Sequence, residues 1–206
     1  MNCRPRCSFC YIFCTLYTLM LMFFLSVILF WIIISPSSVK FHVTDASLTQ
    51  FNLTSNNNLY YNLKVNITVR NPNNNIIVYY RKITAIAWYK DNAFGWVRLT
   101  PFDQGHKNTT FLQAVFAGQS VIKLKLKQLG EYKDEASVGI HRDLAVDFDL
   151  RIRAKYGRIK SSRFNPPIVQ CRRLRVPLIS NATSPPPFTV TRCRTGYFFS
   201  DRDADG

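Results

Sequence analysis

Few residues in this 206-residue chain have the types and spacing that catalysis requires. The clearest candidates are two carboxylates separated by a single residue, Asp147 and Asp149, which could serve as a general acid and base. They share one face of an alternating segment with Arg151 and Arg153, and opposite charges on a strand face tend to pair. We therefore expect cross-strand ion pairs here. Because spacing identifies no nucleophile–base grouping, the sequence predicts a protein that is not an enzyme.

Metal-ligand candidates are equally sparse. The segment 201–206 matches the first six positions of a calcium-binding loop, but the bidentate Glu that completes such a loop is absent. A charged, frayed tail is the better interpretation. The chain also lacks glycine-rich phosphate motifs, so we expect no metal and no cofactor. Three histidines stand outside any metal-binding motif and are expected to be ordinary surface side chains: His42, His106 and His141.

The six cysteines fall into two groups. Cys171 and Cys193 lie far from the N-terminus, and in an oxidising compartment such a pair is expected to form a disulfide. The other four precede a long apolar run, where S-acylation is typical of juxtamembrane cysteines. Two alternatives remain open for them: a metal cluster, whose spacing matches no zinc or iron–sulfur motif, and simple apolar packing. The four acylation candidates are Cys3, Cys7, Cys10 and Cys14.

Positive charge is the strongest compositional signal, with 27 Lys and Arg against 12 Asp and Glu and a net charge of +15. The densest cluster is Arg172, Arg173 and Arg175, which we predict to bind a polyanion. Nucleic acid is the usual partner of such a surface, but an extracellular location argues against it. Acidic cell-wall polysaccharide and anionic lipid headgroups fit the same electrostatics. A solvated basic face with no dedicated ligand is the remaining interpretation.

The N-terminal region predicts a membrane anchor. From Ser8 to Val39 there is no Asp, Glu, Lys or Arg, and residues 11–35 are long and apolar enough to cross a bilayer as a helix. The alternative is a cleaved signal peptide, whose apolar core is usually about 7–15 residues and therefore shorter than this one. Arg4 and Arg6 precede the span, so the positive-inside rule places the N-terminus in the cytosol.

These observations predict three parts: a cytosolic Cys/Arg-rich tail at 1–10, a transmembrane helix at 11–35 and an extracellular domain at 36–206. Export would make the acceptor asparagines accessible to glycosylation. Four Asn-x-Ser/Thr sequons begin at Asn52, Asn66, Asn108 and Asn181.

The exterior part is predicted to be mainly β. Residues 144–156 alternate apolar and polar, as expected for a strand with one buried face, and residues 63–69 repeat the pattern. Several short strands separated by turn signals indicate an antiparallel sandwich or barrel. One short helix is predicted near 129–136. Further strands are expected at 40–48, 76–80, 83–89, 95–99, 109–116, 168–178 and 188–193.

Several short motifs, in this order and spacing, resemble the plant harpin-induced-like proteins, whose outer part is a late-embryogenesis-abundant group 2 domain. The resemblance implies a small β-sandwich with a helix, similar to fibronectin type III. It also implies roles in plant defence, stress responses and attachment of the plasma membrane to the wall, with plasmodesmata as a further location. The motifs are Asn71–Asn73, Val78–Tyr80, Arg153–Gly157, Ile168–Cys171, Val176–Leu178 and Thr191–Cys193.

Two functional hypotheses follow. The first is a single-pass plasma-membrane protein whose β-sandwich is a non-catalytic interaction module, tethering the membrane to acidic wall polymer or to a partner membrane protein, with self-association as a further option. The second is a lipid-binding or stress-protective domain whose apolar interior accepts a ligand.

Overall fold

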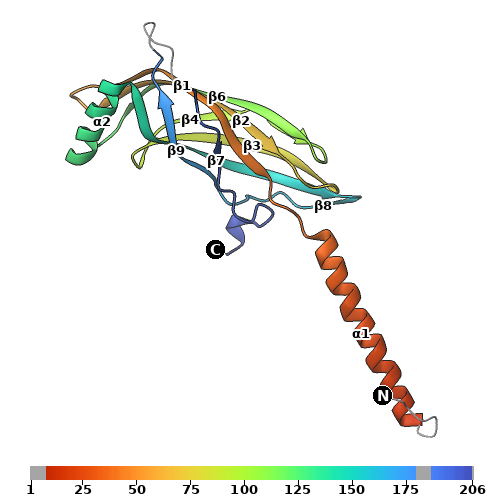
Figure 1. The fold of residues 1–206 in the computed structure, drawn as a ribbon. Coiled ribbons are helices and arrows are strands. Elements are labelled where there is room, and N and C mark those ends of the chain that lie inside the picture. The colour runs from red at the N-terminus through yellow and green to blue at the C-terminus, as the bar shows by residue number, and fades with distance from the viewer. Residues whose placement is uncertain (1–7, 180–186, 206) are drawn as a thin grey trace. The chain divides into compact units, whose positions relative to one another are not determined.

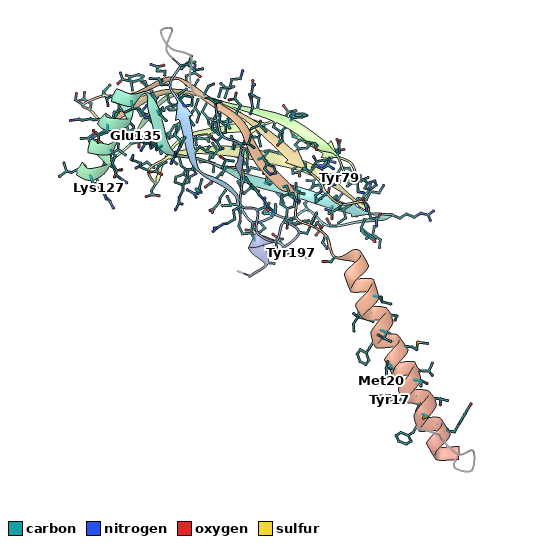
Figure 2. The ribbon with its side chains drawn as sticks, viewed as in Figure 1. Tyr17, Met20, Tyr79, Lys127, Glu135 and Tyr197 are labelled. Carbon is teal, nitrogen blue, oxygen red and sulfur yellow. A yellow bond between two sulfur atoms is a disulfide. The ribbon has the colours of Figure 1, made fainter. Side chains whose placement is uncertain are left out.

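The computed structural model describes residues 8–179 and 187–205 and divides the chain after Pro36 into two units. The first contains helix α1 (Ser8–Ile34), within which Tyr11–Leu29 is long and apolar enough to span a membrane. Side chains such as Tyr17 and Met20 project from this helix (Figure 2). The helix starts three residues before the predicted span and ends just before Ser35-Pro36, because proline disfavours helix at the residue preceding it.

Polar side chains within α1 satisfy their hydrogen bonds locally. The hydroxyls of Thr15, Thr18 and Ser26 each donate to the carbonyl three residues earlier, at 2.7–2.9 Å. Hydroxyls bonded in this way leave no unpaired donor in an apolar environment.

The second unit is an antiparallel β-sandwich, as the sequence predicts (Figure 1). Its first sheet has the order β10-β1-β2-β6, and every pairing is antiparallel. The predicted alternation holds in β2, where Leu63, Val65, Ile67 and Val69 are all buried. The strands are β1 (Lys40–Leu53), β2 (Asn58–Arg70), β6 (Thr109–Val121) and β10 (Thr191–Arg192).

The second sheet has the order β4-β3-β7-β8, with β5 paired to β3 and β9 paired to β7. The two strands predicted at 76–80 and 83–89 form a single strand, β3, because a register shift between Tyr80 and Lys82 lets it bend without ending. The strands are β3 (Ile76–Tyr89), β4 (Asn92–Leu99), β5 (Phe102–Gln104), β7 (Ile140–Tyr156), β8 (Ile159–Lys160) and β9 (Val169–Pro177).

The core between the sheets is rich in aromatic rings. The fully buried rings include Phe41, Tyr80, Phe94, Phe148 and Phe198, and many lie within aromatic contact distance of a neighbour. Rings of this size fill the space between two sheets and supply much of the apolar burial.

Helix α2 (Leu126–Val138) covers one end of the sandwich (Figure 1). It begins three residues before the predicted helix and ends at Gly139, which has the left-handed φ of 73° that favours glycine after a helix. Its inward side carries Tyr132 and Glu135, whereas Lys127 is exposed (Figure 2). We call this the α2 end and the opposite end, where the chain enters at Ser37, the entry end.

The C-terminal segment is not the frayed tail that the sequence predicts. Phe198 is fully buried, and residues Arg202–Asp205 form a short 3-10 helix, η1. The Asp201 carboxylate accepts from the backbone N–H of Asn165 at 3.2 Å, and Arg202 pairs with Asp149 at 3.1 Å. The burial of one aromatic ring therefore anchors the charged residues that follow it.

Candidate functional site

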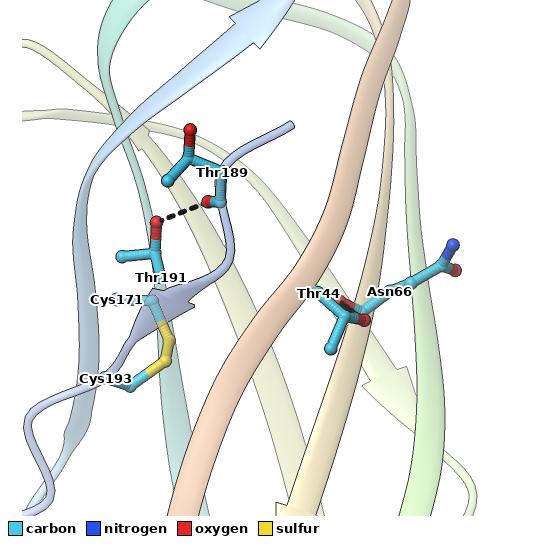
Figure 3. The surroundings of a disulfide bond; sticks show 6 residues. All are labelled: Thr44, Asn66, Cys171, Thr189, Thr191 and Cys193. Atoms are coloured by element: carbon cyan, nitrogen blue, oxygen red, sulfur yellow. Dashed lines mark hydrogen bonds between the residues drawn. A yellow bond between two sulfur atoms is a disulfide. The ribbon is translucent and has the colours of Figure 1, made fainter. Parts of the chain in front are cut away.

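Cys171 and Cys193 form a disulfide, which joins β9 in one sheet to the residue after β10 in the other (Figure 3). Their Cα atoms lie 4.3 Å apart, and both residues are buried. Backbone bonds between Gln170 and Arg194, at 2.8 and 2.9 Å, flank the bridge. The bridge thus fixes β9, the strand that carries the predicted arginine cluster.

A pocket of about 320 Å³ lies between the middle of β9, the first part of β7, the β3–β4 turn and α2. It combines one aromatic ring with both signs of charge. Its lining residues are Trp88, Lys90, Asp91, Gln128, Glu131, Asp143, Ala145, Arg172 and Arg173.

Arg172 lines this pocket and is held by an ion pair. Its Nη2 lies 2.9 Å from a carboxylate oxygen of Asp147, and its guanidinium lies 5.9 Å from the Trp88 ring centre. Burial raises the pKa of Asp147 above its ordinary value, with the positive charge of Arg172 opposing that rise. Asp149 pairs instead with Lys82 and Arg202. The predicted ion pairing of both carboxylates is confirmed, although the partners lie on other segments than Arg151 and Arg153.

Arg173 and Arg175 are both exposed, and neither has an acidic group within ion-pair distance in the described parts of the chain. Arg173 has a left-handed φ of 58° at a register shift between β7 and β9, which lets two consecutive arginines face outward. The structure brings Arg172 and Arg173 to the pocket, while Arg175 lies outside its lining.

Lys90 closes the pocket on the α2 side and is almost entirely buried. Its ammonium contacts the carboxylates of Glu131 and Glu135. Burial alone lowers the pKa of Lys90, but these two carboxylates outweigh it, so the pKa is raised and the lysine stays charged. The hydrogen bond from Lys90 in turn lowers the pKa of Glu131.

His141 corrects an expectation, because it is fully buried and not a surface side chain. It lies under α2 against the rings of Phe51 and Tyr132, with Nδ1 3.6 Å from Glu135. Burial lowers the pKa of His141, and the adjacent carboxylate opposes this only in part. Tyr89 donates a 2.8 Å hydrogen bond to the same Glu135. His42 is half-buried and His106 is exposed.

The pocket offers charged, amide and aromatic groups to a ligand. The described residues contain no group of three His, Cys, Asp or Glu side chains placed to hold a metal ion. Arginine guanidinium groups, carboxylates and an indole ring instead suit a polar ligand with many hydrogen-bonding groups. Sequence reasoning found the arginines but missed Trp88, Lys90, Gln128 and Glu131, since these come from two segments distant from β9 and only the fold joins them to it.

The structure describes some of the predicted modification sites. Asn52 and Asn108 are exposed, while Asn66 is half-buried on the outer face of β2, where its side chain bonds Asp45 and Gln113. Asn181 lies outside the described residues, as do Cys3 and Cys7. Cys10 lies in the first turns of α1, and Cys14 is exposed on that helix.

Residues 66–170 match the family described as late embryogenesis abundant protein. The chain is also 41% identical over 187 residues to NDR1/HIN1-like protein 3 of Arabidopsis thaliana, covering 90% of this chain and 80% of that protein. NDR1/HIN1-like protein 10 of the same plant is 45% identical, over 76% of this chain and 69% of that protein. This chain belongs to the NDR1/HIN1-like family. The resemblance inferred from short motifs is therefore confirmed.

For this NDR1/HIN1-like chain, the structure shows what one of the motifs behind the resemblance does. Asn71 and Asn73 are buried, and their side chains bond to backbone groups around the β2–β3 loop. The Asn-Pro-Asn motif thus holds the fold together and does not line the pocket beside α2.

Proposed function

We propose that this protein is a single-pass plasma-membrane protein of plant defence or stress responses, whose extracellular β-sandwich tethers the membrane to acidic wall polysaccharide without catalysis. The observation that carries the proposal is the exposed arginine cluster on β9. Arg173 and Arg175 have no acidic partner in the described chain, and the disulfide holds their strand in place.

Arginine at these positions suits a uronate polymer. A guanidinium presents a planar set of donors that can bind a carboxylate through two parallel hydrogen bonds. The Trp88 ring beside Arg172 adds an apolar surface, and Gln128 adds amide groups for hydroxyls. Because Arg172 is neutralised by Asp147, the attraction for a polyanion rests mainly on Arg173 and Arg175.

Retention of the full-length, detergent-solubilised protein on de-esterified pectin tests this role. We expect salt to elute the protein, because the attraction is between exposed charges. An Arg173→Gln, Arg175→Gln variant should elute at lower salt. A Lys64→Gln, Lys123→Gln variant has the same net charge, with both changes at exposed positions off β9, and should elute like the unaltered protein. Equal elution of all three would contradict the assignment.

The membrane part of the proposal rests on α1, which is long and apolar enough to span a bilayer. With Arg4 and Arg6 on the cytosolic side, residues 37–206 would face outside. Protease treatment of sealed vesicles, combined with glycan removal, tests this orientation. An exterior domain would be digested and would carry glycans on its sequons, whereas a protected, unglycosylated domain would contradict it.

Acylation of the N-terminal cysteines would strengthen such an anchor, since each buried CH₂ of an acyl chain adds about 0.8 kcal/mol of membrane affinity. An acyl-exchange assay should label the protein and fail to label a variant with serine at the four positions. Equal labelling of both proteins would remove acylation from the proposal.

Other partners remain secondary. A protein partner or a second copy of this chain could use the same region, but the exposed arginines without an acidic partner in the described chain, Arg173 and Arg175, favour an anionic polymer. The alternative of a lipid inside the sandwich gains no support from the described core, where aromatic rings occupy the space between the sheets.

A further inference from the structure

The chain is fastened firmly where it enters the β-sandwich. The Asn73 side chain accepts a hydrogen bond from the Ser37 N–H and donates one to the Ser37 carbonyl, both at 2.8 Å. Ser38 Oγ donates to the Gly196 carbonyl and accepts from the Phe198 N–H. Asn71 supports Asn73 by accepting from its backbone and side-chain nitrogens. The connection to α1 is therefore built into the domain from Ser37 onward.

Only Ser35 and Pro36 separate Ser37 from the last helical residue, Ile34. The three residue-to-residue steps from Ile34 to Ser37 span about 10 Å at most, even when the chain is fully extended. If α1 is inserted in a bilayer, as the proposed function holds, the membrane surface must come close to the entry end of the sandwich at any angle between the two units.

The entry end presents a basic and apolar projection, the turn between β7 and β8. Arg158, Ile159 and Lys160 are all exposed, with Ile159 exposing 75% of its surface. Ile76, the first residue of β3, pairs with Tyr156 beside this turn, and the clamp residue Asn73 lies just upstream in the chain. Asn75 also lines a cavity of about 290 Å³ together with His106, Lys155 and Gly157. The turn and the Ser37 clamp thus belong to the same end of the domain.

Charge on this projection is unopposed. From Leu150 to Ser200 the sequence contains 11 Lys and Arg and no Asp or Glu. Lys155, Arg158 and Lys160 have no acidic group within ion-pair distance in the described parts of the chain. Lys107 belongs to the same end, because its backbone N–H donates to the Asn73 carbonyl at 3.1 Å. We define the entry-end surface as Lys107, Lys155, Arg158, Ile159 and Lys160.

We propose that the entry-end surface docks on phosphate-bearing headgroups of the bilayer that α1 enters, with Ile159 inserted among them. The proposal rests on the membrane anchoring in the proposed function and is separate from polysaccharide binding. Cations near an anionic membrane are attracted strongly only within about a Debye length, roughly 10 Å. The short connection keeps Ser37 within about 10 Å of the last residue of α1. Docking would hold the sandwich at a fixed orientation and leave the arginines of β9 accessible.

Tryptophan fluorescence of the full-length protein in vesicles containing brominated phosphatidylcholine tests the docking. In an Ile159→Trp variant we expect the new indole to be quenched when phosphatidylglycerol is added to the vesicles, and the quenching to fall at high salt. A Val138→Trp variant places the probe at another exposed apolar position, on α2, and should show no added quenching. Adding Arg158→Gln or Lys160→Gln to the Ile159→Trp variant should weaken docking about fivefold for each charge removed.

A Trp88→Phe, Trp96→Phe background, in which Trp31 of α1 is the remaining native indole, separates failure of docking from failure of anchoring. If Trp31 is quenched but position 159 is quenched no more than position 138, the domain does not dock and the proposal is wrong. If Trp31 is not quenched, the anchoring is wrong and the docking fails with it. If the Arg158→Gln, Lys160→Gln change weakens pectin retention and leaves quenching at position 159 unaltered, the surface binds polysaccharide instead, which also overturns the proposal.

Discussion

The two ends of the sandwich are closed by different chemistry. At the α2 end, charged and titratable side chains are buried together: Lys90, Glu135, His141 and Tyr89. At the entry end, the buried polar groups of the clamp are the neutral amides of Asn71 and Asn73. A neutral clamp holds equally well at any physiological pH, whereas a buried charged cluster depends on the protonation of its members. The attachment to α1 should therefore be insensitive to pH, whereas the stability of the α2 end should depend on it.

The largest expected effect comes from removing the Cys171–Cys193 disulfide, through Cys171→Ser and Cys193→Ser together. The bridge closes a loop of 22 residues, so the chain-entropy model gives about 3 kcal/mol of lost stability. Denaturant unfolding measures the loss. Because the bridge precedes Gly196 and Phe198, which hold Ser38, hydrogen exchange should accelerate more at the entry end than beneath α2. Equal acceleration at both ends would mean that the bridge supports the whole domain and not the clamp in particular.

Glu135→Gln tests the α2 end. It removes a charge that Lys90 contacts at 3.3 Å and that accepts from Tyr89, and we expect a loss of about 2 kcal/mol in the free energy of unfolding. Glu131→Gln is the control, because Glu131 also contacts Lys90 but is 42% exposed, so solvent screening should leave a clearly smaller loss. A larger loss at Glu131 would reverse the roles assigned to the two carboxylates.

Asn73→Ala tests the entry end. Both Ser37 bonds are lost and leave partly buried backbone groups unpaired, which costs about 1–2 kcal/mol. Limited proteolysis should then cleave the variant near Ser37 faster than it cleaves the unaltered protein there. Asn74→Ala changes the exposed neighbouring residue and should leave both stability and the cleavage pattern unaltered. An unchanged rate of cleavage in Asn73→Ala would show that the C-terminal segment alone holds the connection.

The protonation of His141 should make the stability of the α2 end depend on pH. Burial holds its pKa below the value near 6.5 expected in the unfolded chain, so the unfolded state binds the proton more readily. The stability that His141 contributes is therefore fully present above about pH 6.5 and declines as the pH falls toward its folded pKa. Between about pH 7 and pH 5, exchange protection should decrease beneath α2 more than at Ser37. His141→Phe should remove most of that difference; an undiminished difference would show that His141 is not its source.

Sequence patterns predicted the parts of this molecule that local physics determines. Apolar–polar alternation in residues 144–156 and 63–69 identified β7 and β2, because a strand with one buried face alternates in this way. A long run without charged residues identified α1, because a helix that crosses a membrane is apolar on all sides. The two cysteines that pair were also identified from their isolation in the exterior segment.

What failed depends on contacts between distant segments. Nothing in the sequence around His141 distinguishes a buried imidazole from a surface one, since Phe51 and Tyr132, which enclose it, come from β1 and α2. The pocket is similar: Trp88, Glu131 and Arg172 are far apart in the chain and meet only after α2 packs on the sandwich. The anchoring of Arg202 likewise required knowing that Asp149 lies beside the folded C-terminus.

The clamp at Ser37 has a mechanical consequence. Strand β1 begins three residues later and runs antiparallel between β2 and β10, with its ladder bonds perpendicular to the strand axis. A pulling force that enters through Ser37 and acts along β1 would load these bonds in shear, all at once, instead of opening them one after another. A sandwich attached in this way resists tension where it joins its tether.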